Sequence, residues 1–272
     1  MSEGTGIWAY AIGESDRVAG AGGAPGLSWL TGVGDAQVRT VTCSGLTVLA
    51  ADVSLEEFGA AALHEHRADL EWLDEVAQLH HYVIDAAARL FPLLPVRLAT
   101  VYSDDAALWA ALAGHHDQLL DALRRVGGRV EWGVKAYAVA EQGEAATDQG
   151  EAVTAAQAAQ EPGSGLAYLR RRRDQLAAGR EARTVAVTGA RAVHAGLAGK
   201  AAAAMVRPPQ SAQLSRIRRP MLLNAAYLLD VSDGTGFTAA VAAEATAHPE
   251  LRIELTGPWP PYSFAGDDND GR

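Results

Sequence analysis

The chain has 272 residues, of which 49% are hydrophobic and 21% charged, a composition typical of a globular protein long enough for two domains. Its net charge of −10 at pH 7 gives no general attraction to nucleic acid or anionic lipid. Its one cysteine, Cys43, excludes an intrachain disulfide and a cysteine metal cluster. The N-terminus shows no secretory signal pattern, and three cations interrupt the least polar stretch, 185–206. We therefore expect a cytoplasmic protein without a membrane span.

The first part of the chain predicts a strand, a loop and a hairpin. Residues 7–12 form a short apolar run that ends at a glycine and leads into a glycine-rich loop over 17–26. Residues 37–43 and 46–53 are two further strand-like runs. The Ser44-Gly45 dipeptide between them favours a tight turn, so we expect these two strands to pair.

Helices and a strand follow the hairpin. Ser54 opens a short helix, and apolar residues at helical spacing predict a long amphipathic helix over 68–90. Residues 95–102 include β-branched side chains and predict a strand that carries Arg97. A second helical region runs to Val126, where two glycines end it.

The next two segments differ sharply in composition. Residues 129–139 alternate apolar and polar side chains, which predicts a half-buried strand containing Trp132. Residues 141–163 are acidic and contain no aromatic side chain, so we expect a flexible insertion whose deletion leaves folding intact.

The remainder predicts a helical hairpin followed by a strand, a helix and a strand. Two helical segments lie between residues 165 and 206, and Gly179 separates them. Strand-like runs at 221–231 and 251–256 flank a helix over 235–247. This order favours an antiparallel or mixed sheet with helices on one face.

Four segments together carry a family resemblance. They are the helix and strand ending in LFPLLPVRLATVY (73–102), VEWGVKAYA (130–138), GSGLAYLRRRR (163–173) and ELTGPWPPYSF (254–264). In this order they resemble the gas vesicle protein F/L family, and the resemblance covers nearly the whole chain. The last segment is the most specific, because a strand running into Gly-Pro-Trp-Pro-Pro-Tyr-Ser-Phe is rare by chance.

The resemblance implies a two-domain α+β protein. Residues 1–127 would form a modified ferredoxin-like domain, and residues 128–272 an α+β domain whose long helical hairpin packs on the sheet. The last residues, 265–272, are acidic and would form a frayed tail.

The resemblance also implies a role. It is that of a gas vesicle accessory protein and minor vesicle component that binds the hydrophobic shell subunit and other accessory proteins. Such a protein would prevent aggregation of the shell subunit and help to nucleate the vesicle, and self-association is left open. No catalytic residue, cofactor or metal is implied, and neither nucleic acid nor membrane is an expected partner.

Five residues are candidates for contact with partners. The tail aromatics Trp259, Tyr262 and Phe264 alternate with prolines that stiffen the backbone. They pack either on the protein itself or on a partner, because Trp and Tyr dominate interface hot spots. Arg97 and Trp132 belong to the segments that carry the resemblance and complete the set.

Other chemistry finds little support in the sequence. The histidine pairs lack the spacing of a metal site, because adjacent helical residues point about 100° apart, and His80 is expected to be a hydrogen-bonded structural histidine. Glycine-rich residues 20–26 and 196–200 miss the dinucleotide and P-loop patterns. Arg170 to Arg173 sweep round a helix and favour a solvated face.

Two alternative functions stay open. One is a small-molecule or metal-dependent enzyme on a ferredoxin-like scaffold, because that fold supports many activities. The other is a purely structural part of the vesicle wall.

Overall fold

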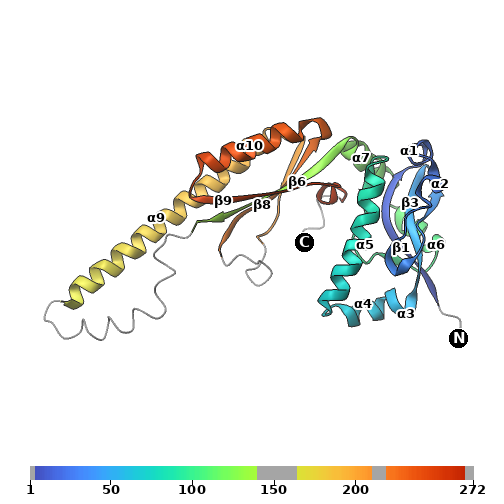
Figure 1. The fold of residues 1–272 in the computed structure, drawn as a ribbon, viewed down its shortest axis with the longest axis horizontal. Coiled ribbons are helices and arrows are strands. Elements are labelled where there is room, and N and C mark those ends of the chain that lie inside the picture. The colour runs from blue at the N-terminus through green and yellow to red at the C-terminus, as the bar shows by residue number, and fades with distance from the viewer. Residues whose placement is uncertain (1–3, 140–163, 210–218, 267–272) are drawn as a thin grey trace. The chain divides into compact units, whose positions relative to one another are not determined.

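The computed structural model describes residues 4–139, 164–209 and 219–266 (Figure 1). The chain forms two compact units. Unit 1 comprises residues 1–131 and 258–272, and unit 2 comprises residues 132–257. The tail after Gly257 thus returns to the unit in which the chain began. The domain division at 127/128 stays a prediction. The predicted insertion, 141–163, lies outside the described residues.

An antiparallel sheet forms the centre of unit 1. Its strands are β1 (Thr5–Glu14), β2 (Arg39–Cys43), β3 (Leu46–Ser54) and β4 (Leu93–Pro95), in the order β2-β3-β1-β4, and β5 (Val101–Tyr102) also pairs with β1. This is the strand order of a β-α-β-β-α-β ferredoxin-like sheet. Ser44 and Gly45 both have positive φ, as the tight turn between β2 and β3 requires. The predicted hairpin is therefore confirmed.

Helices cover this sheet and close its core. They are α1 (Ser15–Gly20), α2 (Gly23–Leu27), α3 (Leu55–Phe58), α4 (Ala60–His66), α5 (Leu70–Ala88), α6 (Asp105–Ala113) and α7 (His116–Val126), with short 3-10 turns at Val33–Asp35 and Tyr262–Phe264. The side chain of Asp69 caps α5 by accepting the Trp72 N–H at 3.1 Å. Helix α5 buries Val76, Val83 and Ile84 in the same core as the sheet residues Trp8 and Leu49.

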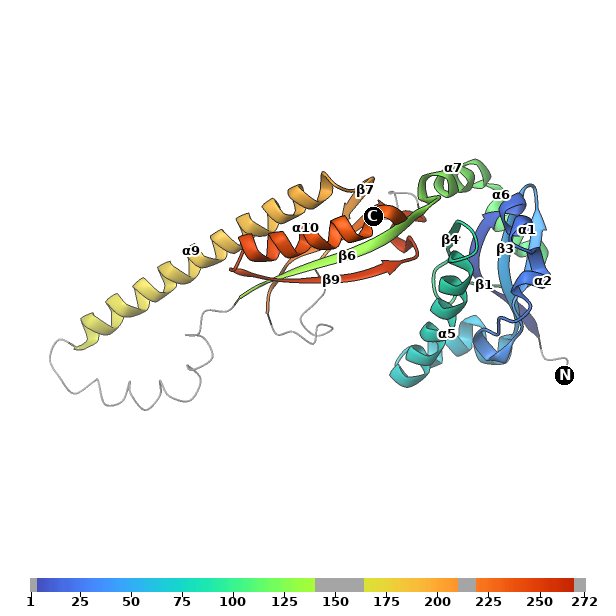
Figure 2. The same ribbon diagram turned by 45° about the horizontal axis from the view of Figure 1, so that its top comes forward.

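Unit 2 is a second sheet with helices on one face. Its strands are β6 (Arg129–Ala138), β7 (Ala203–Val206), β8 (Met221–Asp230) and β9 (Leu251–Trp259), in the order β7-β8-β6-β9. Helices α9 (Ser164–Ala198) and α10 (Gly234–Ala247) lie along this sheet in both views (Figures 1 and 2), and a 3-10 turn at Val231–Asp233 precedes α10. Tyr227, Phe237 and Val193 meet in the shared core. The α+β class with antiparallel sheets is confirmed.

One prediction for unit 2 is wrong. The expected helical hairpin over 165–206 is a single continuous helix, α9, followed by strand β7. Gly179 costs about 1 kcal/mol relative to alanine within a helix, but its neighbours are strong helix formers such as Ala, Leu and Arg. No residue nearby supplies a turn, so the helix continues until Ala198.

Two predictions for unit 1 also need correction. The strand expected over 95–102 is interrupted by a turn at residues 96–100, in which Ala99 has φ 62° and the Thr100 hydroxyl donates to the Arg97 carbonyl at 2.8 Å. The loop expected over 17–26 contains the two short helices α1 and α2 instead. Apolar composition alone did not distinguish a strand from a turn in this segment, in which residues 97–99 are exposed.

None of the helices in the described parts of the chain is both long and apolar enough to cross a membrane.

Candidate partner-binding surface

The tail that follows β9 is fixed to unit 1 by buried polar contacts. Glu131 at the start of β6 is only 6% exposed, and its carboxylate accepts hydrogen bonds from the Ser263 N–H at 2.7 Å and from the Ser263 hydroxyl. The guanidinium of Arg125 donates to the Phe264 carbonyl at 3.1 Å, and the Phe264 ring is buried. Hydrogen bonds to a buried charged group are among the strong ones in proteins. The tail therefore has one defined position on unit 1.

Helix α5 meets the tail through His81. The His81 Nδ1 lies 3.0 Å from the Tyr262 hydroxyl, and the two rings stack with their centroids 5.9 Å apart. Burial is the main reason that the pKa of the Tyr262 hydroxyl is raised, and the negative charges of Asp85 and Glu131 act in the same direction. The Tyr262 hydroxyl thus stays protonated and can donate a hydrogen bond to the His81 imidazole.

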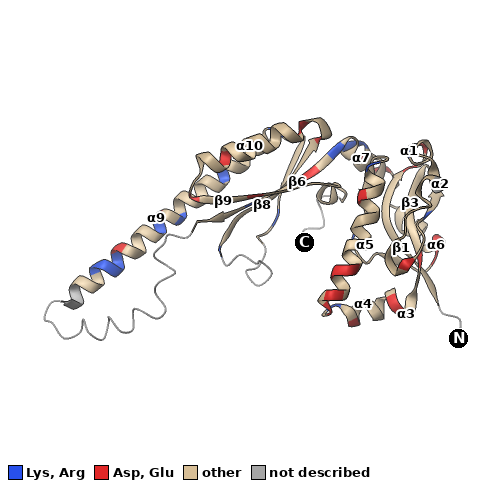
Figure 3. Cartoon of the chain, in the orientation of Figure 1, with Lys and Arg blue, Asp and Glu red and all other residues tan. Residues whose placement is uncertain are grey.

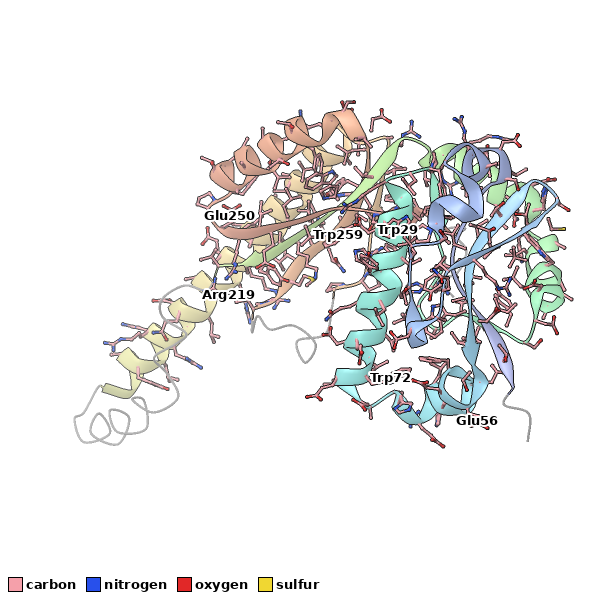
Figure 4. The ribbon with its side chains drawn as sticks, turned by 45° about the vertical axis from the view of Figure 1, so that its right-hand side comes forward. Trp29, Glu56, Trp72, Arg219, Glu250 and Trp259 are labelled. Atoms are coloured by element: carbon pink, nitrogen blue, oxygen red, sulfur yellow. The ribbon has the colours of Figure 1, made fainter. Side chains whose placement is uncertain are left out.

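Trp259 is the part of the tail that remains open to solvent. Its indole and the His81 ring pack edge to face with their centroids 5.4 Å apart. The residue, which is labelled in Figure 4, is nevertheless 42% exposed. Pro258 and Pro260 on either side restrict its backbone. An indole held in this way is a rigid aromatic side chain presented at the surface.

His80 supports the helix that carries His81. Its Nδ1 accepts the Trp8 indole N–H at 3.0 Å, so its Nε2 carries the proton and donates to the Val96 carbonyl at 3.0 Å. Burial is the main reason that the pKa of His80 is lowered to about 4, and neighbouring His81 adds to the lowering. His80 is a hydrogen-bonded structural histidine, as predicted.

Four of the five candidate residues belong to unit 1, and Trp132 belongs to unit 2. Trp259, Tyr262 and Phe264 lie together on unit 1, with Tyr262 and Phe264 directed inward and Trp259 open. Arg97 is exposed in the turn after β4. Trp132 packs in unit 2, with its ring 6.3 Å from that of Phe237. Within the described residues, its buried indole N–H finds no hydrogen-bond partner.

Sequence reasoning missed three residues that position the tail: Arg125, Glu131 and His81. Strand periodicity places Glu131 on the polar face of β6, and nothing in the local pattern indicates that the tail would bury it. His81 is adjacent to His80, but one helix pattern does not tell which of two neighbouring histidines meets a distant segment. No three His, Cys, Asp or Glu side chains within residues 4–139, 164–209 and 219–266 come together as a set that could hold a metal ion.

Comparisons with known proteins agree with the features described above. The family described as gas vesicle synthesis protein GvpL/GvpF matches residues 6–266. Gas vesicle protein L of Streptomyces sp. (strain CB03234) is 38% identical over 235 residues, which cover 86% of this chain and 85% of that protein. Gas vesicle protein F2 of Halobacterium salinarum is 39% identical over 44 residues, or 16% of this chain and 20% of that protein.

Solved structures show the same fold at low identity. The crystal structure of the gas vesicle protein GvpF from Anabaena sp. PCC7120 has a TM-score of 0.64 and 18% identity, and the match covers 96% of both chains. GvpF from Microcystis aeruginosa has a TM-score of 0.58 and 16% identity, with 96% of this chain and 99% of that chain covered. Because the family match and the Streptomyces relative both extend over most of the sequence, this chain belongs to the GvpL/GvpF family of gas vesicle proteins.

Proposed function

We propose that this protein is a gas vesicle accessory protein that binds the hydrophobic shell subunit, with Trp259 as a central contact. The supporting observation is a tryptophan that is held by its neighbours and yet 42% exposed. Family membership supports association with gas vesicle components. The binding partner and the contact residue are the parts that we propose.

A physical argument connects the surface to the role. A shell subunit with a large apolar face aggregates unless that face is covered, because exposed apolar area drives association. A rigid indole binds an apolar partner at low cost, since it loses little conformational freedom on binding. Covering the shell subunit until a nucleus forms would keep it soluble. The same surface would release the subunit when copies of it compete to pair with one another.

The protein would also contact other accessory proteins and take a place at the vesicle as a minor component. Arg97 is the remaining exposed candidate for such contacts, because it lies in a turn on unit 1. The proposed localisation is the cytoplasm, in association with the growing gas vesicle.

Co-purification tests the proposed contact directly. Tagged protein is produced together with the shell subunit, and the recovery of the subunit is compared between the parent and Trp259→Ala. Loss of a hot-spot tryptophan costs roughly 2 kcal/mol or more, so we expect recovery to fall at least about tenfold under subsaturating conditions.

Trp29 provides a matched control. It is 57% exposed and also lies in unit 1, but it does not belong to the tail. We expect Trp29→Ala to recover the shell subunit as the parent does. Equal recovery by Trp259→Ala would refute the tail contact. If the parent recovers no subunit while both proteins are soluble, direct shell binding is refuted.

A further inference from the structure

The first half of α9 packs on nothing that the structure describes. Every residue from Ala167 to Glu181 is exposed, and the core positions of the helix begin only at Ala186. We call residues 167–183 the α9 arm. Leu169 and Leu176 in this arm are 63% and 52% exposed. Helical stability in proteins comes mainly from packing of an apolar face, so an exposed helix with leucines on it lacks a partner.

The α9 arm is strongly basic in an acidic protein. It contains six arginines and two acidic residues, a net charge of +4, whereas the whole chain carries −10. Arg173 pairs with Asp174 at 3.0 Å. Among the described residues, no carboxylate pairs with Arg170, Arg171 or Arg172. In Figure 3 the long blue segment near the start of α9 is this run of arginines.

One face of the arm combines its leucines with part of its arginines. At 100° per residue, Leu169 and Leu176 lie within about 20° of each other around the helix axis. Along the axis, Arg172 and Arg173 lie between the two leucines, about 60° to one side and about 40° to the other side of Leu169. Arg180 lies about 20° from Leu169 and continues the same face. We call these five residues the Arg-Leu stripe. Arg170 and Arg171 point away from the stripe, about 100° and 200° from Leu169.

The outward face of α5 is complementary to this stripe. Glu71, Asp74 and Glu75 are exposed and follow helical spacing, and Tyr82, which is 51% exposed, continues the same face. We call these four residues the acidic face. In Figure 3 the red segments near the start of α5 contain its carboxylates. Arg180 lies eleven positions after Leu169, and Tyr82 lies eleven positions after Glu71, which is about 16 Å of helix axis in each case.

We propose that the Arg-Leu stripe of one copy docks on the acidic face of α5 in a second copy of this chain. The two surfaces match in charge, in length and in having apolar side chains among the charged ones. A two-fold symmetric pair makes the contact twice, because each copy contributes one arm and one acidic face. This inference concerns copies of the chain itself and is independent of Trp259 and of the shell subunit.

Paired charge reversals test the docked face. The oligomeric state of the full chain is measured by sedimentation in low salt, where surface charges are least screened. We expect a dimer whose dissociation constant rises at least about tenfold in Arg172→Glu/Arg173→Glu and less than about threefold in the control Arg170→Glu/Arg171→Glu. Both double variants change the net charge by the same amount on the same exposed helix. Equal weakening by both, or a parent that is monomeric at every concentration, would overturn the proposal.

A mixing experiment identifies the two surfaces as partners. Asp74→Lys/Glu75→Lys gives the acidic face the charge of the arm, so this variant should dissociate when alone. An equimolar mixture with Arg172→Glu/Arg173→Glu pairs opposite charges at both contacts, and we expect the dimer to return. A mixture that stays monomeric while both variants retain the circular dichroism of the parent would refute the pairing.

Binding of the α9 arm arginines to a nucleic acid is the alternative to this docking. Single-stranded RNA added to the parent and to the stripe variant distinguishes this outcome. RNA binding that is lost in Arg172→Glu/Arg173→Glu without any change in oligomeric state would overturn the proposal in favour of a nucleic-acid arm.

Discussion

His80 should make the stability of unit 1 depend on pH between its ordinary pKa of 6.5 and its lowered pKa of about 4. The imidazole is buried and neutral, and it is hydrogen-bonded to Trp8 and to the Val96 carbonyl. Its pKa is lowered from 6.5 to about 4. Above pH 6.5 both the folded and the unfolded chain hold this residue neutral. As the pH falls through 6.5 towards 4, the unfolded chain binds a proton that the folded chain does not, so stability is lost.

The magnitude follows from the two pKa values. A difference of about 2.5 pKa units corresponds to about 3 kcal/mol once the pH has fallen below 4. At pH 5 the unfolded residue is almost fully charged and the folded residue almost fully neutral, and the loss is already about 2 kcal/mol. Most small domains have only about 5–15 kcal/mol of stability, so this loss is readily measured.

The His80→Gln variant isolates this contribution. A glutamine does not titrate, yet its amide can still accept from Trp8 and donate to Val96. Urea unfolding of unit 1 is followed by tryptophan fluorescence at pH 7 and pH 5. We expect the parent to lose about 2 kcal/mol more than His80→Gln between these values. His64→Gln, at an exposed position, controls for the removal of a histidine as such.

Direct titration of His80 provides an independent test of its lowered pKa. The ring protons of His80 are followed by NMR as the pH is lowered. If the ring titrates near 6.5 in the folded protein, or if parent and His80→Gln lose the same stability between pH 7 and pH 5, the assignment of a buried neutral imidazole is refuted.

Three further substitutions probe the tail, the core and the arm. Glu131→Ala removes the acceptor of two hydrogen bonds from Ser263, so we expect the tail contact to weaken by about 1–3 kcal/mol, measured by faster hydrogen exchange and proteolysis of the tail. Gly32→Ala places a methyl group against the Tyr10 hydroxyl, and we expect the free energy of unfolding to fall by about 2 kcal/mol or more. Unchanged stability would contradict the close approach. Gly179→Ala meets no atom and should stabilise α9 by about 0.5–1 kcal/mol, seen as slower cleavage of the arm by trypsin.

Local patterns predicted the regular elements of the fold well. The turn residues Ser44 and Gly45 fixed the hairpin, and apolar spacing defined the helix that became α5, because both signals depend on neighbours within a few residues. The prediction of a helical hairpin is wrong because Gly179 does not form its turn. A glycine costs a helix only about 1 kcal/mol, and the structure shows that the helix continues through it.

The candidate surface was predictable in its residues but not in its arrangement. The proline-aromatic pattern singled out Trp259, Tyr262 and Phe264, yet it gave no direction to their side chains. Their roles differ because of Glu131, Arg125 and His81, which lie between 132 and 181 residues away from their tail partners along the chain. Contacts over such distances leave no periodic signal in a single sequence.

The tail buries Phe264 and partly buries Tyr262 but leaves Trp259 exposed, and this difference has an energetic consequence. A tryptophan on a free, flexible tail would lose backbone and side-chain freedom when it bound a partner, at a cost of roughly 1–2 kcal/mol for each residue fixed. Here that ordering takes place on folding, because Ser263, Phe264 and Tyr262 direct their contacts inward. Trp259 is consequently presented in one position before any partner arrives. Loss of the contacts that hold the tail should therefore reduce the affinity of the proposed surface for its partner, even though Trp259 itself is unchanged.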